Sequence, residues 1–149
     1  MIHRIETHTA YLLRRDKNLY LIGTGGQAML GVENQFLAFN FYHELNIKEA
    51  RELIVYATEL FLKIINTDKD IRPHLRYFPF NEKNIEIDFY IYHPDGHSLS
   101  PDKISLVSIR SGVITYALEF PDQKGTPRPI LLQETYQEAL QKINNENQT

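Results

Sequence analysis

The chain has 149 residues, with 16 lysines and arginines against 19 aspartates and glutamates, a formal net charge of −3 and no cysteine. Without cysteine, disulfides, thiol nucleophiles and thiolate metal sites are excluded. The basic residues are scattered along the sequence and provide no cationic face, so we expect no nucleic-acid partner. At this length we expect one domain, 1–149, in which residues 145–149 form a frayed tail.

The N-terminal residues 1–8 carry charges and histidines where a secretory signal needs an unbroken apolar stretch. No part of the sequence approaches the roughly 18 to 20 consecutive apolar residues of a membrane span. We therefore expect a soluble, cytoplasmic protein with no membrane partner.

The first third of the chain predicts a hairpin followed by a glycine-rich loop. Residues 6–14 and 19–22 are candidate strands, because a charged turn containing asparagine separates them at 15–18. Residues 23–31 hold four of the seven glycines, which is typical of a sharp loop. The aromatic segment 36–42 fits neither the helical nor the strand period, so the sequence leaves its structure open.

A long amphipathic helix is predicted from Ile47 to Asn66, where apolar residues recur at spacings of three and four. Asn46 is suited to be its N-cap, and Glu49 completes a capping box. Burying the apolar face contributes less free energy than ordering about 20 residues costs. This helix is therefore expected to pack on a sheet.

Antiparallel strands are predicted between Ile85 and Phe120. Apolar and polar side chains alternate over residues 85–92, which is the period of a half-buried strand. Residues 104–110 and 113–120 flank Ser111-Gly112, a two-residue connection typical of a β-hairpin. These segments predict a meander of three strands.

Segments rich in proline separate the remaining elements. Prolines between residues 72 and 80 indicate a loop or an edge strand, and three prolines between 121 and 129 indicate a linker before a last helix at 133–144. The predicted fold class is α+β: an antiparallel meander with one long amphipathic helix packed across one face and a shorter C-terminal helix.

The hairpin pairing assigns side chains to two sheet faces, since directly opposed residues share a face. One face, with Val107, Ile109 and Ile114, is apolar and suits the long helix. The other face is mixed, and because tyrosine and arginine are enriched at interfaces, we predict that it binds another protein or a second copy of the chain, unless the C-terminal helix covers it. The predicted binding residues are Tyr90, Tyr92, Ser108, Arg110 and Thr115.

The stretch Gly23–Ala28 matches the G-x-G-x-x-G/A pattern, in which glycines let a backbone approach a pyrophosphate at a helix N-terminus. That chemistry needs a helix after the glycines. The residues between Gly26 and the next aromatic run show no helical period and include Gly31 and Asn34. The sequence therefore favours a structural loop over a dinucleotide site, and we expect no cofactor.

The turn from His93 to His97 brings two imidazoles and the Asp95 carboxylate close together in sequence, a donor set suited to zinc or a non-haem metal. Proline, aspartate and glycine in this order are also typical of a type I turn after a strand. The sequence favours exposed turn histidines, and a metal site at His93, Asp95 and His97 is the alternative.

Other catalytic arrangements have less support in the sequence. No serine lies in a nucleophile elbow between a strand and a helix. Glu86 and Asp88 share a strand face at the spacing of an acid–base pair, but carboxylates that alternate with isoleucines indicate a solvated face. The aromatic residues in this part of the chain indicate core packing more than a ligand pocket; they are Phe78, Phe80, Phe89, Tyr90 and Tyr92.

From these observations we expect a non-enzymatic protein-interaction module, such as an adaptor, a chaperone-like protein or an inhibitor, that uses the mixed sheet face. The alternative is a small ligand-binding or metal-dependent enzyme built on the His93–His97 turn or on Gly23–Ala28. The expectation rests on tyrosine and arginine gathered on one face and on the lack of a convergent catalytic set in the sequence.

Overall fold

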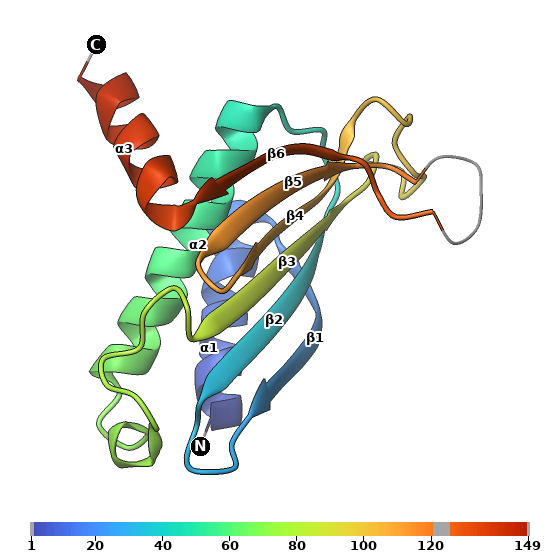
Figure 1. Ribbon diagram of the computed structural model, residues 1–149. Helices are drawn as coiled ribbons and strands as arrows, with labels where there is room; N and C mark the ends of the chain where they lie inside the picture. Colours follow the sequence, from blue (N-terminus) through green and yellow to red (C-terminus); the bar gives the residue numbers. More distant parts are fainter. Residues whose placement is uncertain (1, 121–125, 149) are drawn as a thin grey trace.

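The computed structural model describes residues 2–120 and 126–148. Within them, three α-helices accompany a six-stranded, mostly antiparallel sheet (Figure 1), which confirms the predicted α+β class. No helix in this part of the chain is both long and apolar enough to cross a membrane. In chain order the elements are α1 (Ile2–Lys17), β1 (Tyr20–Gln27), β2 (Asn34–Phe41), α2 (Ile47–Thr67), a 3-10 helix (Arg72–His74), β3 (Ile85–Ile91), β4 (Ile104–Arg110), β5 (Val113–Leu118), β6 (Ile130–Thr135) and α3 (Tyr136–Asn147).

Helix α1 occupies the segment that was predicted as a strand at residues 6–14. Its buried side chains Ile5, Thr9 and Leu13 recur every four residues, which is a helical spacing. The Thr9 hydroxyl donates a hydrogen bond of 2.8 Å to the Ile5 carbonyl oxygen, so its polar group is satisfied on the buried side. The prediction was wrong because a β-branched threonine interrupts the apolar stripe and is itself typical of strands.

Strand β1 contains most of the segment that was predicted as a glycine-rich loop. The predicted strand at 19–22 continues through Gly23, Gly25 and Gly26 to Gln27, and it pairs with β2. Composition alone misled the prediction, because glycine is common in turns but is also compatible with extended backbone. The connection to β2 does contain a true turn glycine, Gly31, with a φ of 98°.

Most of the segment 36–42, whose structure the sequence left open, belongs to strand β2. Leu37 and Phe39 are fully buried on one side, and Ala38 between them is 6% exposed on the other. The strand period is hidden in the sequence because both sides of β2 carry apolar residues.

In the part of the chain that the structure describes, the strands lie in the order β1-β2-β3-β4-β5-β6, and only the pair β2–β3 is parallel. Helix α2 makes the crossover between these two strands, which a parallel pair requires. Its predicted capping box is present: the Glu49 backbone N–H donates to Asn46 Oδ1 at 2.8 Å, and the Asn46 N–H donates to Glu49 Oε1 at 3.0 Å.

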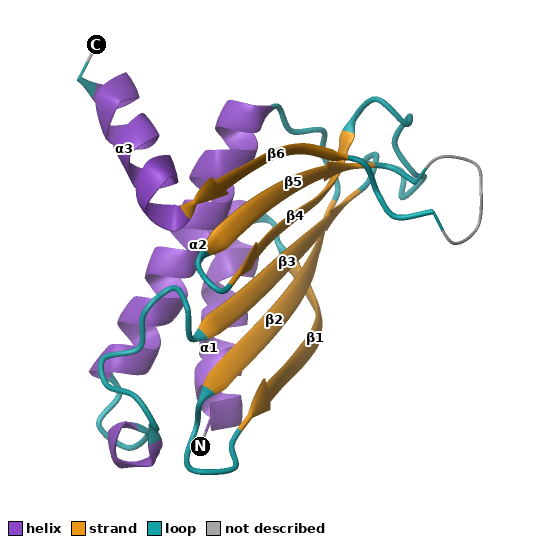
Figure 2. Ribbon diagram, in the orientation of Figure 1, coloured by secondary structure: helices purple, strands orange, loops and turns teal. Residues whose placement is uncertain are grey.

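All three helices lie on one side of the sheet (Figure 2). Helix α2 contacts β3 and β4, α1 contacts α2 and β1, and α3 contacts α2 and β6. Within the described chain, the other side of the sheet has no helix over it. The core between the helices and the sheet includes Leu37, Phe39, Ile54, Phe61, Ile65, Ile85, Ile87, Phe89, Val107, Ile109, Ile114 and Tyr116.

Strands β4 and β5 form the predicted hairpin. The two turn residues, Ser111 and Gly112, have φ angles of 50° and 76°, so both are left-handed, as a type I′ turn requires. The expected register is observed, for example between Ile109 and Ile114.

The C-terminal helix begins later than predicted. Gln133 belongs to β6, which pairs with β5, and α3 starts at Tyr136 after the N-cap Thr135. The sequence pattern could not show that β5 has a free edge for another strand to join. Helix α3 continues through Asn147, so much of the expected frayed tail is helical. Of the predicted linker at 121–129, residues 126–129 have no regular structure and 121–125 lie outside the described residues.

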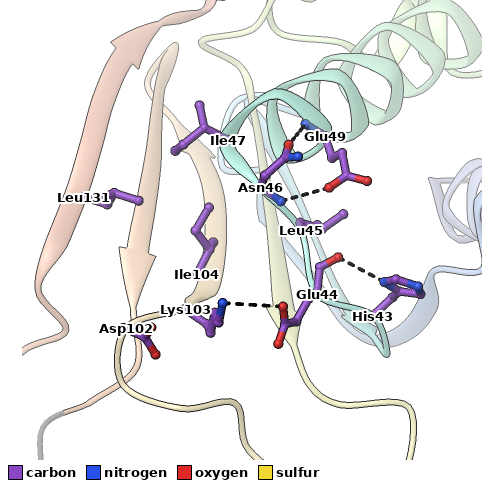
Figure 3. Close-up of a pocket in the computed structure, with 10 residues that line it drawn as sticks. All are labelled: His43, Glu44, Leu45, Asn46, Ile47, Glu49, Asp102, Lys103, Ile104 and Leu131. Carbon is purple, nitrogen blue, oxygen red and sulfur yellow. Dashed lines mark hydrogen bonds and ion pairs between the residues drawn. The ribbon is translucent and has the colours of Figure 1, made fainter.

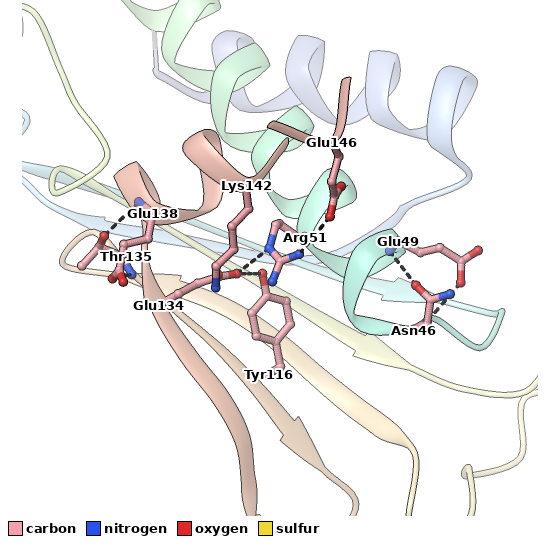
Figure 4. Close-up of polar contacts among 9 residues, drawn as sticks. All are labelled: Asn46, Glu49, Arg51, Tyr116, Glu134, Thr135, Glu138, Lys142 and Glu146. Atoms are coloured by element: carbon pink, nitrogen blue, oxygen red, sulfur yellow. Dashed lines mark hydrogen bonds and ion pairs between the residues drawn. The ribbon is translucent and has the colours of Figure 1, made fainter. Parts of the chain in front are cut away.

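A network of hydrogen bonds around the buried carboxylate of Glu134 joins α3 to α2, β5 and β6 (Figure 4). Glu134 Oε2 accepts hydrogen bonds from Arg51 Nε of α2 at 2.9 Å and from the Tyr116 hydroxyl of β5 at 2.5 Å. Its other oxygen accepts a bond of 2.7 Å from Lys142 Nζ of α3. The side chains of Arg51 and Glu134 are 7% and 1% exposed, so the pair is shielded from solvent.

Burial of Glu134 opposes its ionisation, but the hydrogen bonds from Arg51, Lys142 and Tyr116 outweigh that effect and hold its pKa below the ordinary value. A carboxylate with a depressed pKa contributes stability above its unfolded-state pKa, about 4.3 for glutamate. This contribution is lost as the pH falls through the lower pKa of the folded state.

We predict that Glu134→Gln lowers the free energy of unfolding by roughly 3 kcal/mol at neutral pH, because it leaves Arg51 as a buried cation without its carboxylate. Lys142→Ala, at a side chain that is 44% exposed, should cost less than about 1 kcal/mol. Urea unfolding at several pH values measures both effects. The difference between wild type and Glu134→Gln should shrink as the pH falls below about 4.3; a difference that does not change with pH would contradict the assignment.

A second prediction concerns the turn of the β4–β5 hairpin. Gly112→Ala should lower the free energy of unfolding by about 1 kcal/mol, because a side chain is strained at a φ of 76° and its Cβ would meet the Lys83 side chain at 3.3 Å. Ser111→Asn should leave stability unchanged or raise it by a few tenths of a kcal/mol, because asparagine tolerates the left-handed region better than serine. Thermal unfolding of the two variants provides the comparison.

Candidate functional site

The uncovered side of the sheet, called the open face below, carries those side chains of β2 to β5 that alternate with the core. A row of directly paired residues crosses it, because Ala38 lies opposite Asp88, Asp88 opposite Ser108 and Ser108 opposite Thr115. Many of its side chains are half-buried, so it is neither a core face nor a fully solvated one. Its members are Phe36, Ala38, Asn40, Glu86, Asp88, Tyr90, Leu106, Ser108, Arg110, Val113, Thr115 and Ala117.

Four of the five predicted binding residues lie on the open face: Tyr90, Ser108, Arg110 and Thr115. The fifth, Tyr92, follows β3 and forms an isolated bridge with Ser98. The alternative that the C-terminal helix covers this face is wrong, because α3 packs against α2 and β6 on the other side (Figure 1). No helix of the described chain therefore covers these four residues, of which Ser108 is 7% exposed and the Arg110 side chain 56% exposed.

Asp88 and Arg110 form the charged centre of the open face. Arg110 Nη2 donates to Asp88 Oδ2 over 2.7 Å, and this hydrogen bond raises the pKa of the guanidinium. The Asp88 side chain is only 1% exposed, whereas that of Arg110 is 56% exposed. The prediction of a solvated carboxylate is therefore wrong at Asp88, whose neighbours remove it from water.

Two oxygen acceptors beside this ion pair have no donor within the described chain. They are Asp88 Oδ1 and Asn40 Oδ1, both buried. The two residues sit on neighbouring strands, β3 and β2, on the same face of the sheet. A buried acceptor without a donor costs about 1–3 kcal/mol, so these two oxygens lower the stability of this part of the sheet.

A series of tyrosines extends from the end of β3 toward β1. Tyr92 stacks on Tyr42 with ring centroids 5.9 Å apart, and Tyr42 meets Tyr20 edge-on at 5.3 Å. The Arg14 guanidinium lies over the Tyr20 ring, 4.0 Å from its centroid. Tyr92 thus belongs to an aromatic series of its own and not to the charged centre.

The remaining aromatic residues of the predicted set divide between core and surface. Phe80 and Phe89 are 2% and 0% exposed and belong to the core, as predicted. Phe78 is 45% exposed, with the Arg72 guanidinium 4.0 Å from its ring centroid. These residues do not converge on a common ligand pocket.

The segment from His93 to His97 forms a turn, as its composition indicated. The Gly96 N–H donates to the His93 carbonyl oxygen at 2.9 Å, and the His97 N–H donates to Asp95 Oδ1 at 3.0 Å. His97 Nδ1 lies 2.9 Å from Asp95 Oδ2, and this contact raises the pKa of His97. In the described part of the chain, no group of three histidines and carboxylates is arranged to hold a metal ion.

The dinucleotide pattern at Gly23–Ala28 is not realised as phosphate-binding geometry. Its glycines lie in an edge strand, and the chain turns directly into β2 without a helix. The helix N-terminus that would hold a pyrophosphate is therefore missing from this position.

A shallow pocket of about 470 Å³ lies where β2 passes into α2 (Figure 3). Lys103 Nζ is 3.8 Å from Glu44 Oε2, and His43 Nδ1 is 3.0 Å from the Glu44 carbonyl oxygen. The Asn46 side chain already accepts a hydrogen bond from the Glu49 N–H at the start of α2. We assign no function to this pocket.

No protein-family model matches this sequence, and no curated protein or solved structure matches it.

Sequence reasoning missed Asp88 as the centre of the open face. The missing information was the register between β3 and β4, which sets Asp88 opposite Ser108 and beside Arg110. A long connection joins these strands, so no turn rule fixes their pairing. A charge between two apolar residues, Ile87 and Phe89, was the available signal, because it predicts either exposure or a partner on the next strand.

We predict that Arg110→Ala destabilises the fold by about 2–4 kcal/mol, since it leaves Asp88 buried without its cation. The double variant Asp88→Ala/Arg110→Ala should recover part of this loss, because it also removes the buried charge. Chemical denaturation of both single variants and the double variant gives the coupling energy. Additive effects would show that the two side chains do not depend on each other.

Proposed function

We propose that this protein is a non-enzymatic interaction module, an adaptor, chaperone-like protein or inhibitor, that binds a partner protein with its open face. The observation that carries the proposal is the one-sided architecture: three helices cover one side of the sheet, and half-buried aromatic and polar side chains remain on the other. Mixed surfaces of this kind, with tyrosine and arginine near the centre, are typical of protein–protein interfaces.

The chemistry of the open face indicates what kind of partner surface it would accept. Phe36, Tyr90 and Leu106 offer apolar area, and the half-buried Glu86 carboxylate offers an acceptor. With Glu86 and Asp88 against a single arginine, the centre has an excess of negative charge. A partner surface with apolar side chains and a lysine, arginine or amide donor would complement it.

Two further expectations belong to this proposal. A protein partner is favoured over nucleic acid, because the cation on the open face, Arg110, is already paired with Asp88. We also propose that the interaction takes place in the cytoplasm.

The test is site-specific photo-crosslinking in the native host. A photoreactive residue at Leu106 or Thr115 should yield one recurring crosslinked partner. The same residue at Glu52, an exposed position on α2, should not yield it. Crosslinks from Glu52 alone, or none from either open-face position, would overturn the proposal.

Once the partner is identified, we predict that Tyr90→Ala weakens its binding by about tenfold or more. The reason is that replacing a tyrosine at an interface centre by alanine commonly lowers the binding free energy by about 2 kcal/mol or more. Tyr11→Ala is the matched control, because Tyr11 is 61% exposed on α1, away from the open face. Calorimetric titration measures both affinities, and thermal unfolding confirms that both variants fold. Equal affinities of the two variants would show that the open face is not the binding surface.

A further inference from the structure

Strand β1 is an edge strand of unusual composition. Its eight residues, Tyr20 to Gln27, include no charged residue and no proline. Proteins commonly protect an exposed edge with lysine, proline, a bulge or a covering element, and here only a bulge between Leu21 and Gly23 is present. The backbone groups on the outer side of β1 thus have no strand beside them within the described chain.

Exposed apolar side chains accompany this edge. Leu21 and Ile22 on the strand are 39% and 53% exposed, and Met29 and Leu30 in the following turn are 92% and 68% exposed. Clustered exposed apolar residues on a soluble domain mark contact surfaces more often than isolated ones do.

At two glycines of β1, the structure of the single chain gives no reason why a larger residue would not fit. Neither Gly23 nor Gly25 has a positive φ. A Cβ added to Gly23 would meet no atom within 4 Å, and one added to Gly25 would make an ordinary contact of 3.7 Å with Phe36. Glycine within a strand costs about 0.5–1 kcal/mol and often marks a place where another backbone or ligand approaches closely. Gly26 differs, because its Cβ would lie 2.6 Å from the Asn34 carbonyl oxygen.

The two halves of β1 are complementary to each other in size. Tyr20, Leu21 and Ile22 form a bulky half, and the other end, Gly26, Gln27 and Ala28, is smaller. An antiparallel partner with the same sequence would set the bulky half of one strand beside the small half of the other. Large side chains packed beside strand glycines compensate for the missing side-chain contacts.

The two ends of β1 are also complementary in charge. Arg14 lies over the Tyr20 ring and donates to Asn18, and within the described residues it forms no ion pair. At the other end, Glu33 Oε1 accepts a hydrogen bond of 3.3 Å from the Leu30 N–H, so this carboxylate lies in the turn that follows β1. Antiparallel pairing would bring Arg14 of one copy toward Glu33 of the other, at both ends of the interface.

We propose that two copies of this chain pair through β1, antiparallel about a two-fold axis near Thr24, and so form one continuous sheet. The pairing is isologous: the same strand contributes from each copy, and the contact closes after two molecules. It satisfies the free backbone groups of the edge, covers Leu21 and Ile22, and uses the space beside Gly23 and Gly25. This interface is separate from the open face and does not depend on the function proposed for it.

Light scattering coupled to gel filtration, over a concentration series, tests the proposal. The wild-type mass should rise from 17.5 kDa toward twice that value. Gly23→Lys should weaken the dimer by about tenfold or more without loss of thermal stability, since its Cβ meets nothing in the monomer and an edge lysine opposes strand pairing. Leu131→Lys, at a position 51% exposed on the other edge strand, β6, should leave the dimer unchanged.

A single cysteine supplies a second, independent measurement. The natural chain has no cysteine, so Thr24→Cys introduces one thiol at the proposed axis. Residues directly opposite in antiparallel strands have Cβ atoms about 4.5–5.5 Å apart, close enough for a disulfide after small adjustment. Mild oxidation should therefore yield a covalent dimer from Thr24→Cys but not from Leu131→Cys. A mass that stays at 17.5 kDa throughout, or a dimer lost in Leu131→Lys and retained in Gly23→Lys, would overturn the proposal.

Discussion

The parallel pairing of β2 with β3 determines which side of the sheet is covered. Parallel neighbours cannot be joined by a tight turn, so the chain must cross over the sheet, and α2 makes that crossing. Once α2 lies on one side, α1 and α3 lower their own exposed apolar area by packing against it. A single connection thus commits all three helices to one layer and leaves the opposite face open.

The charged network at Glu134 maintains this arrangement at the C-terminal end. Arg51 comes from the crossover helix and Lys142 from the last helix, and both bind the same carboxylate on β6. Hydrophobic burial alone is non-directional, whereas these hydrogen bonds require α3 to stay beside α2. On the open face, Asp88 and Arg110 form a second ion pair with a buried carboxylate. There the arginine is half exposed, and the pair lies on the side of the sheet without helices.

The elements that the sequence predicted well are those whose signals are local. The capping box at Asn46, the spacing of apolar residues in α2 and the Ser111-Gly112 turn all lie within a few residues, and the structure has them as expected. The predictions for the segments that form helix α1 and strand β6 were wrong because the surrounding structure determines both elements. Thr9 lies on a buried helix face, where its hydroxyl has a hydrogen-bond acceptor. Gln133 lies in a strand that pairs with the edge of β5. The open-face residues were grouped from the hairpin register, while Asp88 required a pairing between strands joined by a long connection.

The glycines of β1 show how a misleading signal becomes informative once the fold is known. As sequence they indicated a loop or a dinucleotide site. In the structure they lie in an extended edge strand, where Gly23 and Gly25 have no steric reason to be glycine. In the proposed dimer the two-fold axis is perpendicular to the sheet, because that operation makes edge strands antiparallel. Both open faces then lie on the same side of one sheet, with all helices on the other. A partner that binds the open face would accordingly meet two copies of the Asp88–Arg110 centre on one surface, and binding at both would raise its apparent affinity without any new contact.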